Sequence, residues 1–279
     1  MVDSVLSRVV EALRPVPGLS ALVLGGSRGR GTAGPTSDYD VGLYYEPDAP
    51  LDIEALRAAI APLVDDPAST VTGIGEWGPW INGGGWLTIG GAEVDLLYRD
   101  LGRVRAVIAD ARQGRFSMNY QPGHPHGFCS AIWMGEAATC QPLLDPAGVI
   151  AGLKQQAWPY PEALRDALIA RFGWEVDFAI DNAELAARRG ELTHIAGCAY
   201  RALCCTAQVL FALNGRYLIN EKGAVPEAAA FPLTLPGLAE TQALLWKDIG
   251  GGDPARALGR LREVSGGLKN LLQRTAASK

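Results

Sequence analysis

The chain has few cysteines and few histidines. Its 279 residues include 5 Cys and 3 His, no two cysteines have the Cys-x-x-Cys spacing, and Cys204 and Cys205 are adjacent. This pattern excludes a disulfide framework and a cysteine-based zinc site. It fits a reducing compartment, so the sequence predicts a cytoplasmic protein.

An excess of positive charge and long apolar runs are also missing. The formal net charge is −5, and acidic and basic residues are interspersed. A polynucleotide backbone is neutralised by a basic stripe, so long nucleic acid is not expected as a partner, while a short RNA end stays open. No apolar run approaches the length of a membrane span, and residues 1–15 resemble an amphipathic helix, not a signal peptide. We therefore expect a soluble protein without a membrane partner.

Hydrophobic periodicity and turn residues predict an α+β protein with two domains. In residues 1–150, helices are expected to flank a small mixed sheet, whose candidate strands are 20–26, 38–45, 70–77, 86–89 and 92–98. Gly90-Gly91 predicts a hairpin between the last two strands. From Pro161 onward the pattern is almost entirely helical, so residues 151–279 are expected to form a helical bundle.

The first glycine-rich segment carries a misleading pattern. Gly29-x-Gly31-x-x-Gly34 has the spacing of a dinucleotide-binding turn. That turn requires a long helix to begin within it, whereas residues 35–37 lead directly into the next strand. A Gly-Lys-Ser/Thr ending is also missing, which excludes a P-loop.

The same segment offers a different phosphate site. The strand stops at Gly25-Gly26, where the missing side chains would let a phosphate approach backbone N–H groups, with the Ser27 hydroxyl beside them. Arg28 and Arg30 supply positive charge nearby. Taken alone, the segment would be no more than a flexible surface loop.

Three aspartates give the turn its context. Asp38 and Asp40 are separated by Tyr39 on a strand, so both carboxylates project from one face while Tyr39 can pack inward on the other. Two such carboxylates repel each other unless a cation lies between them. Asp95, set between apolar residues of a later strand, also needs a partner. If the two strands are neighbours, three carboxylates converge and can hold two Mg²⁺ ions.

These motifs resemble the nucleotidyltransferase superfamily that includes DNA polymerase beta. The resemblance rests on Gly25-Gly26-Ser27, Arg30-Gly31, Ser37-Asp38-Tyr39-Asp40-Val41 and the later strand with Asp95. It implies that the turn, with Gly25, Gly26, Ser27, Arg30 and Ser37, holds the triphosphate of ATP or another nucleoside triphosphate. It also implies that Asp38, Asp40 and Asp95 bind divalent metal and carry the catalysis.

Two shorter segments resemble the aminoglycoside adenylyltransferases of the streptomycin and spectinomycin type. Gly75-Glu76-Trp77 resembles a Gly-Glu-Trp of those enzymes whose glutamate is taken as the general base, which points to Glu76. Residues 214–228 resemble their lysine-containing segment that reaches the nucleotide phosphates, which points to Lys222. Without a function, Glu76 would be an exposed carboxylate at a strand edge. Lys222 would be an exposed charge at the start of a helix.

Other polar and aromatic groups have structural and functional readings. The pair His124 and His126 is expected to be structural, because magnesium chemistry needs oxygen ligands. The set Glu175, Asp177, Asp181 and Glu184 is either an exposed helix face or a negative surface for a cationic acceptor. The set Trp77, Trp80 and Trp86 either lines an acceptor pocket or packs between the domains.

Together these features predict magnesium-dependent transfer of a nucleoside monophosphate, AMP from ATP, to a hydroxyl of a small molecule, and the resemblance implies an aminoglycoside-like acceptor. Two alternatives stay open. One is a toxin-like or regulatory enzyme that modifies a protein or a tRNA end, and the other is a catalytically silent nucleotide-binding protein.

Overall fold

The computed structural model describes residues 4–277, and the chain divides into two compact units. The first unit comprises Met1–Ala111, Phe116–Gln121 and Phe128–Pro159. The second comprises Arg112–Arg115, Pro122–Gly127 and Tyr160–Lys279. Both units are therefore assembled from more than one stretch of sequence.

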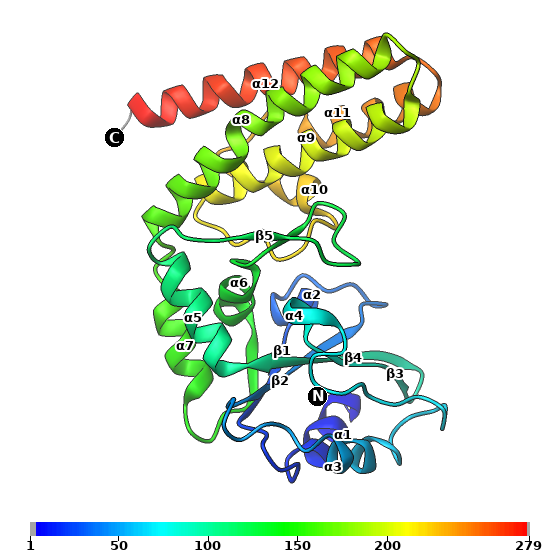
Figure 1. Cartoon of the computed structure of the whole chain (residues 1–279), viewed down its shortest axis with the longest axis vertical. Helices are drawn as coiled ribbons and strands as arrows, with labels where there is room; N and C mark the ends of the chain where they lie inside the picture. Colours follow the sequence, from blue (N-terminus) through cyan, green and yellow to red (C-terminus); the bar gives the residue numbers. More distant parts are fainter. Residues whose placement is uncertain (1–3, 278–279) are drawn as a thin grey trace. The chain divides into compact units, whose positions relative to one another are not determined.

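The first unit combines short strands with short helices (Figure 1). Its elements are, in order, α1 Ser4–Leu13, β1 Ala21–Leu24, α2 Gly26–Gly29, β2 Tyr39–Tyr45, α3 Ile53–Ile60, α4 Gly78–Ile81, β3 Gly84–Ile89, β4 Ala92–Asp100, α5 Leu101–Ala111, β5 Met118–Asn119, β6 Phe128–Cys129, α6 Ile132–Thr139, β7 Gln141–Leu144 and α7 Val149–Ala157. Side chains of Asp52 and Asp100 accept N–H bonds from Ala55 and Arg103 at 3.0 Å, which caps α3 and α5.

Five strands form one mixed sheet in the order β3-β4-β2-β1-β7. β2 and β4 are parallel, while the other three pairs are antiparallel. Gly90 and Gly91 join β3 to β4 with φ of 59° and 76°, which is the left-handed conformation that a tight hairpin turn requires. The α+β class, the mixed sheet and the hairpin are confirmed.

The strand predicted at residues 70–77 is wrong. Residues 74–77 form a turn, and Gly75 adopts a φ of 86°, outside the β region. Only the beginning of the segment reaches the sheet, where the Thr72 N–H donates to the Gly84 carbonyl at 2.8 Å. The glycines that interrupt the apolar residues therefore prevent a strand here and produce a loop.

Alternation along the strands gives the sheet two different faces. One face carries the hydrophobic core, with Tyr39, Val41 and Leu43 of β2 packed with Leu13 of α1 and Leu56 of α3. Figure 1 shows α1 and α3 together on that face. The prediction that Tyr39 packs inward is confirmed, because it is only 8% exposed. Asp40 and Asp95 consequently project from the opposite face.

The second unit is helical, as predicted, with α8 Glu162–Ala187, α9 Leu192–Leu213, α10 Ala224–Ala229, α11 Leu238–Gly250 and α12 Pro254–Ala277. Within the described part of the chain, α9 is long and apolar enough to span a membrane by length and composition, which the sequence analysis did not anticipate. However, 72% of its most apolar window is buried within the protein. That burial is typical of the central helix of a bundle.

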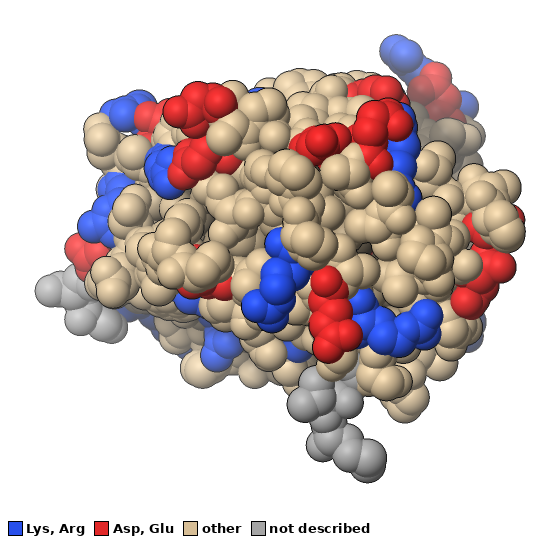
Figure 2. Space-filling model, turned by 90° about the horizontal axis from the view of Figure 1, so that it is seen from below, with Lys and Arg blue, Asp and Glu red and all other residues tan. Residues whose placement is uncertain are grey.

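Charges on the surface are mixed in sign. On the face shown in Figure 2, basic and acidic side chains form small groups separated by uncharged residues. This distribution agrees with the interspersed charges of the sequence.

Candidate active site

Three aspartates converge on the sheet face opposite the core. Asp40 of β2 and Asp95 of β4 are direct partners across the parallel pair, and Asp38 lies just before β2. One carboxylate oxygen from each residue lies within 4.8 Å of the others, and all three side chains are partly buried. β2 and β4 are therefore neighbours, which was the condition for the three carboxylates to converge.

The Asp40 carboxylate is electrostatically unfavourable in this position. Burial raises its pKa from 3.8 to about 6, and the negative charges of Asp38 and Glu136 act in the same direction. Arg30 and Arg99 lower the pKa, without reversing the effect. Three carboxylate oxygens held this closely match the ligands that Mg²⁺ prefers, so the residues present fit a divalent cation.

The glycine turn is built around Asp40. The Gly25 N–H donates to the Asp40 carbonyl at 2.7 Å, and Gly26 has a φ of 56°. A Cβ on Gly26 would lie 1.7 Å from Oδ2 of Asp40. The missing side chain at Gly26 thus makes room for the Asp40 carboxylate, a constraint that is not evident from the sequence. Because the Gly25 N–H is already bonded, a phosphate at this turn would bind to Gly26 and Ser27.

Arg28 fixes the segment that leads into β2. Its Nε donates to the carbonyls of Ser37 and Asp38 at 3.0 Å, and its guanidinium lies 3.8 Å from the centroid of the Tyr39 ring. The Ser37 hydroxyl accepts the Gly34 N–H at 3.0 Å, so this predicted nucleotide ligand also closes the turn before Asp38. Arg28 therefore contributes to the position of the first carboxylate through the main chain.

Sequence reasoning missed a buried ion pair on the same face of the sheet. Arg99 lies four residues after Asp95, and its Nε and Nη2 donate to both oxygens of Glu136 on α6 at 2.7 and 2.8 Å. The Arg99 side chain is only 3% exposed. The even spacing between Asp95 and Arg99 indicates that both side chains lie on one face of the sheet. The partner of Arg99, Glu136, is 37 residues away and is not evident from the pattern.

Glu76 and Lys222 lie in turns. Glu76 is exposed, and its Oε1 would be 2.7 Å from a Cβ on Gly73, so the carboxylate folds back over its own loop. Lys222 is exposed in the second unit, where its N–H donates to Oδ1 of Asn220 at 2.9 Å. The placement of Glu76 on a strand was wrong for the reason given above.

Both histidines next to Pro125 take part in structural contacts of the second unit. Nδ1 of His124 lies 3.1 Å from Oε2 of Glu221, whose other oxygen accepts the His126 N–H at 3.3 Å. Nδ1 of His126 lies 3.0 Å from Nη1 of Arg201. Burial, followed by the charge of Arg201, lowers the pKa of His126 to about 4, so this ring is neutral at pH 7.

The predicted acidic face of α8 is compensated by basic side chains. Its four carboxylates all form ion pairs: Glu175 with Arg171 and Arg201, Asp177 with Lys269, and Asp181 and Glu184 with Arg262. An uncompensated negative surface is therefore not present on these four residues.

The three tryptophans have different environments. Trp80 packs against Phe128 and Trp133, with ring centroids 5.4 and 5.3 Å apart. Trp77 stacks on Trp86, with centroids 4.5 Å apart and planes 20° apart, and Trp86 remains 70% exposed. Trp80 is thus partly buried against other aromatic rings, whereas Trp86 presents an open aromatic face.

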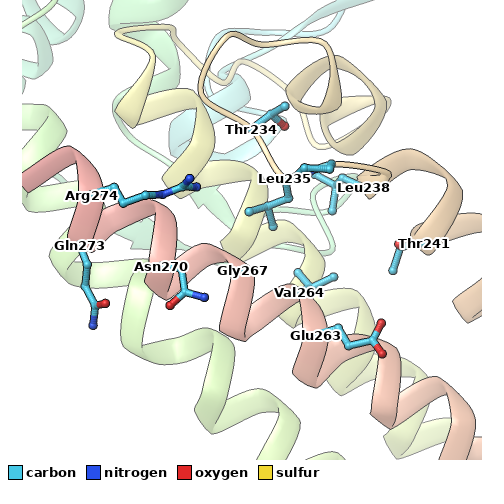
Figure 3. A pocket seen from close by; sticks show the side chains of 11 residues that line it. Thr234, Leu235, Leu238, Thr241, Glu263, Val264, Gly267, Asn270, Gln273 and Arg274 are labelled. Carbon is cyan, nitrogen blue, oxygen red and sulfur yellow. The ribbon is translucent and has the colours of Figure 1, made fainter.

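Two cavities lie in the second unit, and in the described part of the chain neither is lined by a residue predicted to bind the nucleotide or the metal. One, of about 630 Å³, lies between α12 and the segment at the start of α11, with Leu235 and Leu238 on one side, Val264 of α12 on the other, and Glu263 and Arg274 among its polar groups (Figure 3). The other, of about 980 Å³, lies along α8 and α9 near the loop that joins them. The carboxylates are therefore the feature that marks the candidate site.

Comparison with known proteins gives a family match within the first unit. Residues 6–77, about a quarter of the chain, match the family model of the nucleotidyltransferase domain; the match includes Asp38 and Asp40 and ends before Asp95. The chain is similar to a solved structure, a nucleotidyltransferase-like protein from Exiguobacterium sibiricum 255-15, with 12% identity, a TM-score of 0.41, and coverage of 95% of this chain and 71% of that one. The comparison with curated proteins gives no match. The match over residues 6–77 supports nucleotidyl transfer in general as the chemistry of the first unit.

Proposed function

We propose that the protein transfers a nucleoside monophosphate, AMP from ATP, to a hydroxyl of a small molecule and releases pyrophosphate in a magnesium-dependent reaction. The observation that carries this proposal is the cluster of Asp38, Asp40 and Asp95, whose carboxylate oxygens lie within 4.8 Å of one another. A Gly-Gly-Ser turn adjoins the cluster, and the match to the nucleotidyltransferase domain includes that turn.

The residues have separate tasks in this reaction. Asp38, Asp40 and Asp95 would hold the divalent cations, while N–H groups of Gly26 and Ser27 donate to phosphate oxygens. Bound Mg²⁺ supplies neutralisation of phosphate charge and a lower pKa for the attacking hydroxyl. The acceptor oxygen forms a bond to the α-phosphorus, and the bond from that phosphorus to the bridging oxygen breaks. The electron pair leaves with pyrophosphate, and the hydroxyl proton passes to a carboxylate.

Two carboxylates are candidates for that general base. Glu76 is favoured by the resemblance to Gly-Glu-Trp of the aminoglycoside adenylyltransferases. Glu93 is exposed on β4 and shares a sheet face with Asp95, two residues away. The resemblance also assigns Lys222 to the nucleotide phosphates, where a cation would stabilise the developing negative charge.

The proposal is tested with ATP labelled at the α-phosphate, Mg²⁺ and a panel of aminoglycosides and other hydroxylated metabolites, by following labelled product and pyrophosphate. Asp40→Asn keeps the side-chain volume and removes a negative ligand, so turnover should fall at least about a hundredfold. Asp48→Asn, at an exposed turn after β2, is the matched control and should retain turnover. Wild-type turnover in Asp40→Asn would refute the metal assignment.

The same assay separates the other roles. If Glu76 is the general base, Glu76→Gln should lower the single-turnover rate by a factor of about 10²–10⁴. If Glu93 is the base, Glu93→Gln should lower that rate by the same factor. Lys222→Ala should weaken binding of Mg-ATP by about 1.5–3 kcal/mol, whereas Lys247→Ala should not. Labelling of a protein or a tRNA instead of any small acceptor would favour a regulatory enzyme, and failure to bind Mg-ATP would refute the transfer of AMP from ATP.

A further inference from the structure

The stacked pair of Trp77 and Trp86 lies on the same sheet face as the carboxylate cluster. Trp86 of β3 is the direct cross-strand partner of Asp95 on β4. Leu87 and Ile89, its neighbours in the alternation, are buried in the core on the other face. Trp86 therefore projects beside the third metal-site aspartate.

The position of the Trp77 ring is fixed by the loop that carries it. The Thr72 hydroxyl accepts the Gly84 N–H at 3.0 Å, and the Tyr98 hydroxyl donates to the Thr72 carbonyl at 3.0 Å. A Cβ on Gly84 would lie 3.1 Å from the Trp77 ring and 1.7 Å from the Leu96 carbonyl oxygen. The glycine thus allows the loop and its ring to lie directly on the strands, and the stacked pair is a built feature of the first unit.

The order of the strands places this tryptophan pair across the carboxylates from the Gly25-Gly26-Ser27 turn. Across the sheet, in the strand order β3-β4-β2-β1, Trp86 comes first, then Asp95, then Asp40, and then the turn that begins at Gly25 after β1. Adjacent strands are about 4.8 Å apart, so the carboxylates lie between the tryptophans and the turn.

This order has a stereochemical consequence for the proposed reaction, on which the inference rests. In a displacement at phosphorus, the attacking and leaving oxygens are in line on opposite sides of the phosphorus atom. If the leaving pyrophosphate is held at Gly26 and Ser27, the acceptor hydroxyl must approach from the side of Asp95 and Trp86. An indole face that is open to solvent provides an apolar surface for a ring at that location.

We propose that the Trp77–Trp86 pair is the acceptor platform, on which a sugar or cyclitol ring stacks with its reactive hydroxyl toward the carboxylates. The C–H groups of such a ring contact the open face of Trp86, and its hydroxyls remain at the rim. Trp77 supports the indole from behind and does not itself contact the ring. Trp86 is therefore a specificity-determining residue for the acceptor and not for the nucleotide.

The kinetic test compares Trp86→Ala and Trp86→Phe with Trp174→Ala, a control at an exposed tryptophan of the second unit. Trp86→Ala should raise KM for the acceptor at least tenfold and leave KM for Mg-ATP unchanged, and Trp86→Phe should recover most of the loss. Trp174→Ala should behave as the wild type. An increase in KM for Mg-ATP with an unchanged acceptor KM would overturn the inference, because it would place the nucleotide base on Trp86.

A binding test keeps this inference separate from the proposed reaction. The indole N–H signal of Trp86, assigned by its loss in Trp86→Phe, is followed by NMR while streptomycin, spectinomycin, methyl glucoside or adenosine is added to the full chain. At about 10 mM, which detects millimolar dissociation constants, at least one of the three sugar or cyclitol compounds should shift it more than adenosine does. No shift with any of these three, or a larger shift with adenosine, would overturn the platform. Asp40→Asn should keep the shift and lose turnover, so failure of the reaction and failure of the platform are distinguishable.

Discussion

Asp40 should weaken the metal-free fold at neutral pH, because burial and the charge of Asp38 raise its pKa to about 6. An unfolded chain has a carboxyl pKa near 3.9, so the folded state binds the proton more tightly than the unfolded state does. Stability from this group is fully present below pH 3.9 and is lost as the pH rises through 6. A pKa about two units higher in the folded protein corresponds to about 3 kcal/mol.

The substitution Asp40→Asn isolates this effect, because asparagine resembles the protonated acid in size and carries no charge. In EDTA, the free energy of unfolding of the variant should equal that of the wild type near pH 4 and exceed it by about 2–3 kcal/mol at pH 8. Added Mg²⁺ should stabilise the wild type by mass action and leave the variant nearly unchanged.

Urea unfolding at pH 4, 6 and 8, followed by circular dichroism with and without Mg²⁺, measures both differences. The comparison within each pH removes the contribution of other titrating groups. A variant that is less stable than the wild type at pH 8 in EDTA would refute the reasoning, since it would show that the charged carboxylate makes favourable contacts without a cation. An equal Mg²⁺ effect on both proteins would show that Asp40 is not a ligand.

Two further substitutions test the surroundings of the site. Gly26→Ala places a Cβ 1.7 Å from Oδ2 of Asp40 on a backbone with a φ of 56°, so we expect a loss of about 1–2 kcal/mol from the backbone strain alone, measured by urea unfolding, and weaker Mg²⁺ binding by calorimetry. Glu136→Gln removes the carboxylate charge that is bonded to the buried Arg99 guanidinium and should cost about 3–5 kcal/mol in urea unfolding, whereas Glu54→Gln, in an exposed ion pair, should cost less than about 1 kcal/mol.

Local patterns predicted the hairpin and the side-chain direction of Asp40 and Asp95, whereas the pairing of their two strands, which brings the carboxylates together, was only a condition of the prediction. The alternation around Asp40 and Asp95 assigned both to one face, because side-chain direction along a strand has a period of two. Gly90-Gly91 predicted the hairpin, because few other residue pairs adopt the required left-handed turn. These features depend on neighbouring residues, so the sequence contains the relevant information directly.

Features that depend on distant residues were not evident from the sequence. The reason for the glycine at position 26 is a carboxylate 14 positions later, and the partner of Arg99 is Glu136 on a different element. The carboxylates of α8 resembled a free acidic face, but Arg262 pairs with two of them across about 80 positions of sequence. In each case the deciding contact is tertiary, and no local spacing encodes it.

The second unit is not a continuous piece of the chain, and this limits how the protein can be divided. Residues 122–127 belong to that unit and supply the contacts of His124 and His126 to Glu221 and Arg201. A fragment that begins at Tyr160 would lack them, and the Glu221 carboxylate, which is only 8% exposed, would lose two of its donors. Removing the partners of a buried charge lowers the free energy of unfolding, so a helical fragment that begins at Tyr160 should be less stable than the same unit in the full chain. Fragment studies of the bundle need the loop that precedes it in sequence by more than thirty residues.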